Sequence, residues 1–74
     1  MPSLNKLRWR CRRGTLELDL ILQTYLENNY PLAPVNEQQA FVRLLELEDT
    51  ALADYLLGNV LPAAELIRHY AKAK

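Results

Sequence analysis

The sequence has little glycine, cysteine or histidine, and these shortages exclude several kinds of site. Its 74 residues include two glycines, one cysteine and one histidine. Two isolated glycines cannot form a glycine-rich phosphate-binding loop. One cysteine allows no internal disulfide, which favours a reducing compartment, and neither Cys11 nor His69 has a second soft ligand beside it. We therefore expect no catalytic constellation, no metal site and no tightly bound cofactor, with Cys11 in or near the core and His69 solvated.

Long apolar runs and targeting segments are missing as well. No stretch approaches the roughly 20 apolar residues of a membrane-spanning helix, so we expect no membrane insertion. The bases near the N-terminus lack the apolar stretch and cleavage site of a secretory signal. The basic segment also begins almost at Met1, with no organelle-targeting extension before it. The expected location is the cytoplasm of a bacterium.

Leucine is abundant, and this composition predicts an all-α fold. Half of the residues are hydrophobic and sixteen are leucine, which is typical of helices packed on helices. No strand pattern, internal repeat or sustained heptad is present, so we expect residues 1–74 to form a single domain, a compact bundle of four to five short helices. So short a chain has a thin core with little room for a pocket, so we expect function on the surface. A monomer is expected, although exposed leucines could allow dimers.

Gly14 separates the first two expected helices. Ser3 can cap a helix over 4–12, and Gly14 ends it because glycine tolerates the left-handed conformation that terminates helices. Thr15 can then cap a second helix over 16–29. This helix is the most apolar and should be central, with apolar residues on more than one face. These residues are Leu16, Leu18, Leu20, Ile21, Leu22, Tyr25 and Leu26.

Proline marks the loop before the third expected helix. Pro31 and Pro34 forbid continuation of the second helix, and Asn36 with Gln39 three residues later forms a capping box. The inward stripe of the third helix consists of Ala40, Phe41, Leu44, Leu45 and Leu47. This is ordinary amphipathic spacing.

Two short helices are expected to complete the bundle. A cap at Asp49 or Thr50 begins the fourth helix, and Gly58 with Asn59 closes it. Pro62 suits the first turn of a fifth helix. The fifth helix continues through Leu66, Ile67 and Tyr70.

The balanced net charge hides a strong segregation. Residues 1–14 carry five bases and no acid, whereas residues 15–74 carry nine acids and four bases. The five bases are Lys6, Arg8, Arg10, Arg12 and Arg13. Such charge polarity orients an approaching partner more than it adds affinity.

The bend between the first two helices is the best candidate for a binding site. Trp9 lies among the arginines, and an exposed indole beside arginine is typical of a binding hot spot. Glu17 falls in the first turn of the second helix, where the macrodipole favours a carboxylate. We expect this bend to expose the Arg13 guanidinium, the main chain at Gly14 and the Glu17 carboxylate together.

Each of these residues also has a purely structural interpretation. The basic run could be a solvated helix face, and Trp9 could cover the edge of the core. Gly14 could be only a helix stop, and Glu17 only a surface acid that suits the helix dipole. A large functional loss in a folded Glu17 variant would indicate contact with a partner.

The segment from Trp9 to Asp19 resembles the Arg-Gly-x-x-Glu signature of the succinate dehydrogenase assembly factor (FAD assembly factor) family. Here the signature residues are Arg13, Gly14 and Glu17. The resemblance continues in an acidic leucine-rich segment, 44–49, and in a short helix ending at Gly58. Together the two blocks span about residues 4–60. The residue after Arg-Gly is Thr15, where many relatives have an apolar side chain.

The resemblance implies a five-helix bundle that binds the flavoprotein subunit of succinate dehydrogenase, or of fumarate reductase in bacteria. Members of the family promote covalent flavinylation, and the flavin bond is thought to form autocatalytically on a histidine of the client. Carried over by position, the signature places Arg13, Gly14 and Glu17 at the client-binding surface. Arg10 and Trp9 are expected flanking contacts, and Asp49 is a further candidate that helix capping explains equally well. The factor would act by holding the client in a productive arrangement.

Three other functions are considered. A nucleic-acid binder would use the basic first helix and show a steep salt dependence, but five cations against an acidic remainder fall short of a strongly basic domain. An antitoxin for a membrane toxin would also be a binding role, and the sequence does not exclude it. An enzyme would need a pocket and a catalytic constellation, and the sequence indicates neither. We expect a binding protein that does not bind nucleic acid.

Overall fold

Five α-helices and one short 3-10 helix make up the protein. The computed structural model describes residues 4–58 and 60–73. In chain order the elements are α1 (Leu4–Arg10), α2 (Leu16–Asn28), η1 (Tyr30–Leu32), α3 (Val35–Leu45), α4 (Asp49–Leu57) and α5 (Ala63–Ala73). The expected all-α class and bundle of short helices are confirmed.

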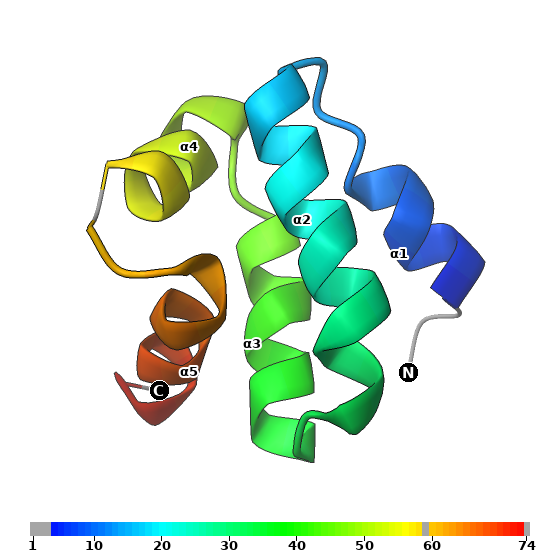
Figure 1. Cartoon of the computed structure of the whole chain (residues 1–74), viewed down its shortest axis with the longest axis vertical. Coiled ribbons are helices and arrows are strands. Elements are labelled where there is room, and N and C mark those ends of the chain that lie inside the picture. Colours follow the sequence, from blue (N-terminus) through cyan, green and yellow to red (C-terminus); the bar gives the residue numbers. More distant parts are fainter. Residues whose placement is uncertain (1–3, 59, 74) are drawn as a thin grey trace.

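The helices pack around α2 and α3. These two helices run side by side through the middle of the molecule, with α1 on one flank and α4 and α5 on the other (Figure 1). α2 contacts α1, α4 and α5, which confirms its expected central position, and α3 shares its largest contact with α5. The loop between α1 and α2 therefore lies at the outer edge of the bundle.

Aromatic side chains form the middle of the core. Phe41 on α3 is fully buried, and its ring centroid lies 4.8 Å from that of Tyr25 on α2 and 5.6 Å from that of Tyr30 on η1. Both pairs have tilted rings, and their centroid distances are within the range of favourable aromatic contacts. Full burial of a side chain of this size stabilises a fold by about 2 to 3 kcal/mol. This cluster therefore fixes α2 against α3.

Three of the expected helix starts are wrong by one or two residues. α3 begins at Val35, because the Pro34 carbonyl accepts hydrogen bonds from both Glu37 N and Gln38 N at 3.0 Å. Asn36 therefore lies inside the helix and forms no capping box, and the Gln38 amide donates instead to the Tyr30 carbonyl at 2.8 Å. α4 begins at Asp49 and α5 at Ala63, since the carbonyls of Glu48 and Pro62 accept their first intrahelical hydrogen bonds.

The first two helices end slightly earlier than expected. α1 ends at Arg10 and α2 at Asn28, before the expected ends at Arg12 and Asn29. Thr15 occupies the N-cap position of α2 as predicted, but its side chain makes no capping hydrogen bond. The expected contributions of Ser3 and Asn59 lie outside the described residues.

The apolar surface of α2 is only partly covered. Leu18, Leu22, Tyr25 and Leu26 are buried, whereas Leu16 and Leu20 are 83% and 65% exposed. Leucine at these two positions continues the apolar character of the helix onto a second face, as the sequence indicated, and no other element within residues 4–58 and 60–73 buries these two side chains. α2 therefore presents apolar side chains to solvent.

Candidate functional site

The corner between α1 and α2, residues 11–15, is held to the core at its first residue. Cys11 and Leu7 are fully buried, and Cys11 N donates to the Leu7 carbonyl at 3.0 Å. Arg12 N then donates to the Trp9 carbonyl at 3.1 Å, so the chain leaves α1 through a hydrogen-bonded turn. A buried side chain at Cys11 thus fixes where the corner starts.

Cys11 lies buried at the corner, whereas His69 lies on α5. Burial is the main reason why the pKa of the Cys11 thiol rises to about 11, with the nearby Arg13 opposing it, so the thiol stays neutral and weakly reactive. His69 is exposed on α5, as expected. Among residues 4–58 and 60–73, no group of three potential ligands lies close enough to hold a metal ion.

Gly14 turns the chain between the two helices. Its φ is +84°, a left-handed conformation that a residue with a Cβ adopts only at a cost of about 1 to 2 kcal/mol. A Cβ built there meets no atom within 4 Å, so its main chain faces open space. Gly14 is therefore required by backbone conformation rather than by packing, and it leaves its main chain accessible to a partner.

The Arg13 side chain connects this corner to the end of α3. One terminal nitrogen donates to the Leu45 carbonyl, and the other donates to the Leu47 carbonyl at 3.2 Å and to Asp49 Oδ1 at 3.3 Å. The last carbonyls of a helix lack intrahelical donors and carry its negative dipole end, so a guanidinium is well suited to them. Arg13 therefore joins the α1–α2 corner to α3 and to the first residue of α4.

The expectation that the Arg13 guanidinium faces outward is therefore wrong. The Arg13 side chain is 14% exposed and lies against the turn between α3 and α4, while Gly14 and Glu17 are exposed as expected. The free carbonyls at the end of α3 explain the difference, because they offer a shielded guanidinium more acceptors than the corner itself does. The three signature residues thus divide into one that holds the corner and two that face solvent.

Asp19 also holds the corner in place, a role that was not predicted from the sequence. Its Oδ1 atom accepts a hydrogen bond from the main-chain N–H of Arg13 at 2.5 Å. Asp19 lies in the first turns of α2, so this contact fixes the corner to the helix that follows it. An acid six residues after an arginine is a weak sequence signal, because only the turn at Gly14 brings the two together.

Trp9 is exposed and pairs with a neighbouring cation. Its side chain is 71% exposed, which rules out the interpretation that it covers the core edge. The Arg12 guanidinium carbon lies 5.2 Å from the centre of the indole ring, within cation–π range. A surface hollow of about 300 Å³ is lined by Asn5, Arg8, Trp9 and Arg12.

Arg10 and Asp49 lie beside the corner. Both line a second hollow of about 320 Å³, together with Arg12, Arg13 and Leu45. Arg10 is exposed, and the Asp49 side chain is 54% exposed although it pairs with Arg13. The structure thus brings Arg10, Arg13 and Asp49 to one hollow, while Gly14 lies in the corner and Glu17 in the first turn of α2, both exposed. A hollow of this size is at the lower limit for small-molecule sites, which favours a macromolecular partner.

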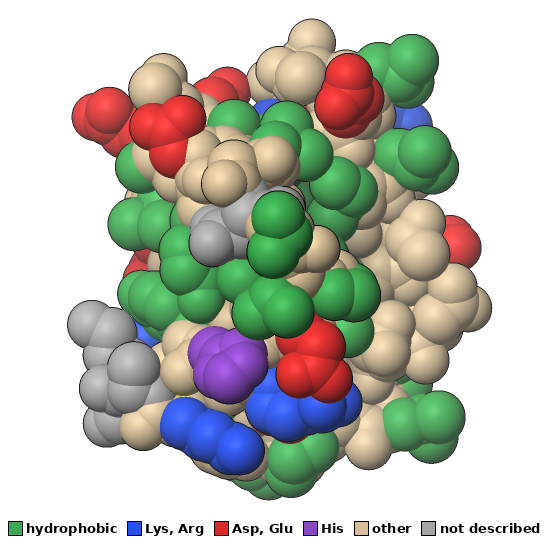
Figure 2. Space-filling view, turned by 60° about the vertical axis from the view of Figure 1, so that its left-hand side comes forward, with side chains coloured by type: hydrophobic (Ala, Val, Ile, Leu, Met, Phe, Trp, Pro, Cys, Tyr) green, Lys and Arg blue, Asp and Glu red, His purple; other side chains and the backbone are tan. Residues whose placement is uncertain are grey.

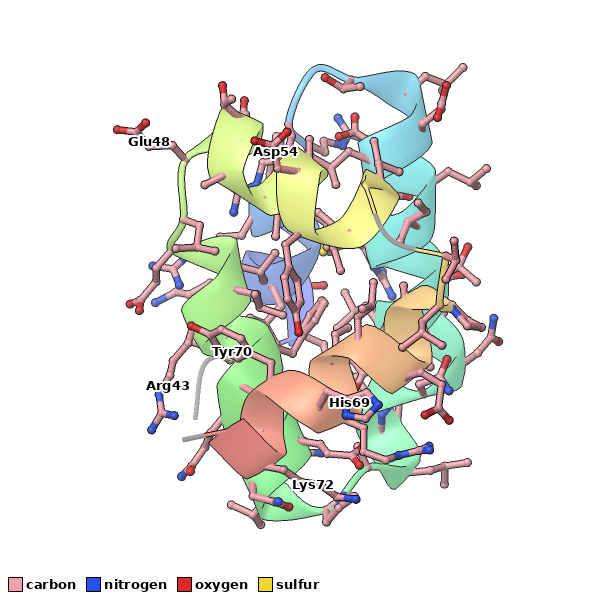
Figure 3. The ribbon with its side chains drawn as sticks, turned by 90° about the vertical axis from the view of Figure 1, so that its left-hand side faces the viewer. Arg43, Glu48, Asp54, His69, Tyr70 and Lys72 are labelled. Atoms are coloured by element: carbon pink, nitrogen blue, oxygen red, sulfur yellow. The ribbon has the colours of Figure 1, made fainter. Side chains whose placement is uncertain are left out.

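The face formed by α4 and α5 carries a different pattern. Hydrophobic side chains gather over these two helices, with acids along the α4 edge and His69 beside bases along the α5 edge (Figure 2). Glu48 and Asp54 belong to the acidic edge, and Lys72 lies below His69 on α5 (Figure 3). Of the six residues predicted for partner binding, only Asp49, the first residue of α4, belongs to these two helices.

Known proteins are similar to this chain over most of its length. The model of a family described as flavinator of succinate dehydrogenase matches residues 5–73. The chain belongs to this family. A FAD assembly factor from Coxiella burnetii is 46% identical over 57 residues, which cover 77% of this chain and 70% of the relative. A FAD assembly factor from Shewanella oneidensis is 40% identical over 69 residues, 92% of this chain and 84% of the relative.

The family assignment predicted from the signature is confirmed. The family consists of FAD assembly factors for the flavinylation of succinate dehydrogenase, a chaperone-like role rather than catalysis. The search of solved structures gave no significant match. Within the described ranges, no helix has both the length and the apolar character needed to cross a bilayer.

Proposed function

We propose that this flavinator-family protein binds the flavoprotein subunit of succinate dehydrogenase and promotes covalent attachment of FAD to it. The contact is made by the corner surface, which we define as Trp9, Arg10, Gly14 and Glu17, with Asp49 at its edge. Arg13 holds this surface in shape from behind. The flavoprotein subunit of fumarate reductase is a second client, and the protein acts as a monomer in the bacterial cytoplasm.

The observation that carries this proposal is the exposed main chain at Gly14, between a solvent-facing indole and a solvent-facing carboxylate. Trp9 and Glu17 are exposed, and the space beside Gly14 is open. All three lie in the segment that the family model matches. A bare main chain allows a partner to approach the backbone closely, and the flanking indole is the type of residue that dominates binding energies.

The protein's contribution is positioning. Its reactive groups are few, since Cys11 is buried with a raised pKa and His69 lies on α5, far along the chain from the signature. Holding two reacting groups in a productive geometry can lower a barrier by about 7 to 11 kcal/mol in favourable cases. In this proposal the client supplies the histidine and the flavin, and the corner surface holds the client in the arrangement where they meet.

The nucleic-acid alternative loses support from the structure. One of the five N-terminal cations, Arg13, is committed to the carbonyls of Leu45 and Leu47, and Arg12 lies over Trp9. Nucleic-acid affinity scales with the number of phosphates that free cations neutralise. Because some of these basic side chains already bind groups within the protein, the corner is better suited to a protein partner than to a nucleic acid.

A strain that lacks this chain tests the proposed function. The flavoprotein subunit of succinate dehydrogenase from that strain should show strongly reduced flavin fluorescence on a denaturing gel, and the restored gene should return it. Antibody detection of the subunit serves as the control for its abundance. Undiminished fluorescence in the deletion strain would contradict the proposal.

Two substitutions at Gly14 should separate backbone strain from contact with the client. Gly14→Ala should cost about 1 to 2 kcal/mol of stability, whereas Gly14→Asn should cost less because asparagine adopts the left-handed conformation more readily. The larger asparagine should nevertheless weaken client binding more, by about ten-fold or greater, if the client lies against this main chain. Thermal melts and calorimetric titration with the purified subunit measure the two effects. The same rank order in both measurements would argue against contact at Gly14.

A further inference from the structure

A groove between α2 and α5 begins at Leu20, one helical turn along α2 from Glu17. Its upper part is a hollow of about 330 Å³, lined on α2 by Leu20, Ile21, Thr24 and Tyr25 and on α5 by Ala63 and Ala64. A second hollow of about 240 Å³ shares Tyr25 and Ala64 with the first and ends at Glu37 and Arg68. We call the two hollows together the α2–α5 groove. The start of α5 lies beside α2 (Figure 3).

The groove continues the face of α2 that carries Glu17. Residues three and four apart share a helix face, so Glu17 lies in line with Leu20, Ile21 and Thr24. Leu20 is 65% exposed although it is a leucine, and its neighbours in the groove are mainly apolar. A partner that contacts Glu17 therefore lies over the mouth of an apolar groove.

Tyr25 supplies an unused donor to this groove. The residue is 3% exposed, and within the described residues its hydroxyl has no hydrogen-bond partner. Burial is the main reason why the pKa of Tyr25 rises to about 12, so the hydroxyl keeps its proton and remains a donor. A buried hydroxyl without an acceptor is costly, and most such groups in native proteins have a partner. An acceptor supplied from outside would satisfy it.

The end of the groove near Tyr25 can open. Arg68 forms an ion pair there with Glu37 at 3.3 Å and another with Glu65 on its own helix at 2.6 Å. The side chains of Arg68, Glu37 and Glu65 are 47%, 16% and 42% exposed. The exposed pair with Glu65 can hold the arginine after it turns away from Glu37, so the movement breaks only the longer of the two ion pairs. This movement would give an incoming acceptor access to the Tyr25 hydroxyl.

We propose that the α2–α5 groove is a second docking site for the same client, and that it takes an apolar segment of the flavoprotein subunit. A large apolar side chain of that segment lies between Leu20 and Ala63, and one of its main-chain carbonyls accepts a hydrogen bond from Tyr25. The proposal rests on the proposed function. Its occupant is the client because the groove and Glu17 share one face of α2.

Leu20→Glu and Tyr25→Phe test the groove by calorimetric titration with the purified flavoprotein subunit of succinate dehydrogenase. Leu20→Glu places a charge on the apolar wall and should weaken binding by about twenty-fold or more, because desolvated hot spots tolerate charge poorly. Val35→Glu is the matched control, since Val35 is 62% exposed on α3 and should bind as wild type. Circular dichroism verifies that each variant is folded.

Tyr25→Phe gives a result that a purely structural role would not give. Removal of an unsatisfied buried hydroxyl should leave the melting temperature unchanged or raise it, while client binding weakens by about five- to ten-fold. A benzophenone amino acid at position 20 should also cross-link to an apolar segment of the subunit.

The outcomes distinguish the groove from the proposed function. If wild-type protein binds the subunit and Glu17→Ala weakens binding, but Leu20→Glu and Tyr25→Phe bind normally, the groove proposal is overturned and the function stands. If Leu20→Glu instead abolishes self-association and leaves client binding intact, the groove belongs to a second copy and the proposal is again overturned. If the wild-type protein does not bind the subunit at all, both proposals fail.

Discussion

Arg13→Ala is expected to lower the free energy of unfolding by about 3 kcal/mol, which corresponds to roughly 15 °C in melting temperature for a domain of this size. The guanidinium donates to the carbonyls of Leu45 and Leu47 and pairs with Asp49, and its side chain is largely shielded from water. Alanine leaves these carbonyls without donors at the end of α3. Chemical denaturation followed by circular dichroism measures the change.

Two further variants identify the source of that loss. Arg13→Lys keeps the charge but offers one compact donor group in place of a planar fork, so it should recover less than half of the lost stability. Arg12→Ala removes an exposed arginine whose described contact is with Trp9, and its stability should stay within about 0.5 to 1 kcal/mol of wild type. A wild-type unfolding midpoint for Arg13→Ala would show that the contact with α3 contributes nothing.

The position of Arg13 changes how the signature is understood. A motif read from sequence groups Arg13, Gly14 and Glu17 as equivalent contacts, but the structure gives the arginine shielded partners and leaves the other two exposed. Arg13 holds the corner against α3, and Asp19 holds it against α2 through the Arg13 main chain. A client therefore meets a surface whose shape is already fixed, which reduces the entropy lost on binding.

The fold could be predicted largely from local signals. Gly14 separates α1 from α2, the prolines at 31 and 34 end the second helix, and Gly58 ends α4. At Gly58 a Cβ would lie 2.5 Å from the Asp54 carbonyl oxygen, so only glycine allows this close approach. The predicted start of α3 is wrong because the Pro34 carbonyl accepts the first hydrogen bonds of the helix. A capping pattern in the sequence indicates only side-chain hydrogen bonds.

The candidate site could be predicted only in part. Sequence spacing places Glu17 in the first turn of a helix and Trp9 among bases, and both are exposed in the structure. The acceptors of Arg13 lie 32 to 36 residues along the chain, so only the packed bundle brings them together. The exposure of Leu20 could not be predicted either, because the sequence of a leucine-rich helix does not indicate which of its faces lacks a neighbour.

Glu17→Ala should separate binding from folding more sharply than any other change at the corner. The exposed carboxylate lies in the first turn of α2, where its interaction with the helix dipole contributes about 0.3 to 1 kcal/mol. If the client contacts this carboxylate, its loss should weaken binding by about 2 kcal/mol, roughly thirty-fold. Calorimetric titration with the flavoprotein subunit measures the affinity, and covalent flavin fluorescence of the subunit measures the consequence in cells.

Glu27→Ala is the control that the same helix provides. Glu27 is also an exposed acid on α2, but it lies in the last turn, where the dipole disfavours a carboxylate. Its removal should leave stability unchanged or slightly raised, and both affinity and flavinylation should match wild type. The dipole contribution thus has opposite signs in the two variants, while a client contact affects only Glu17. If both variants bind with wild-type affinity, Glu17 does not contact the client. Its interaction with the helix dipole is then its only role.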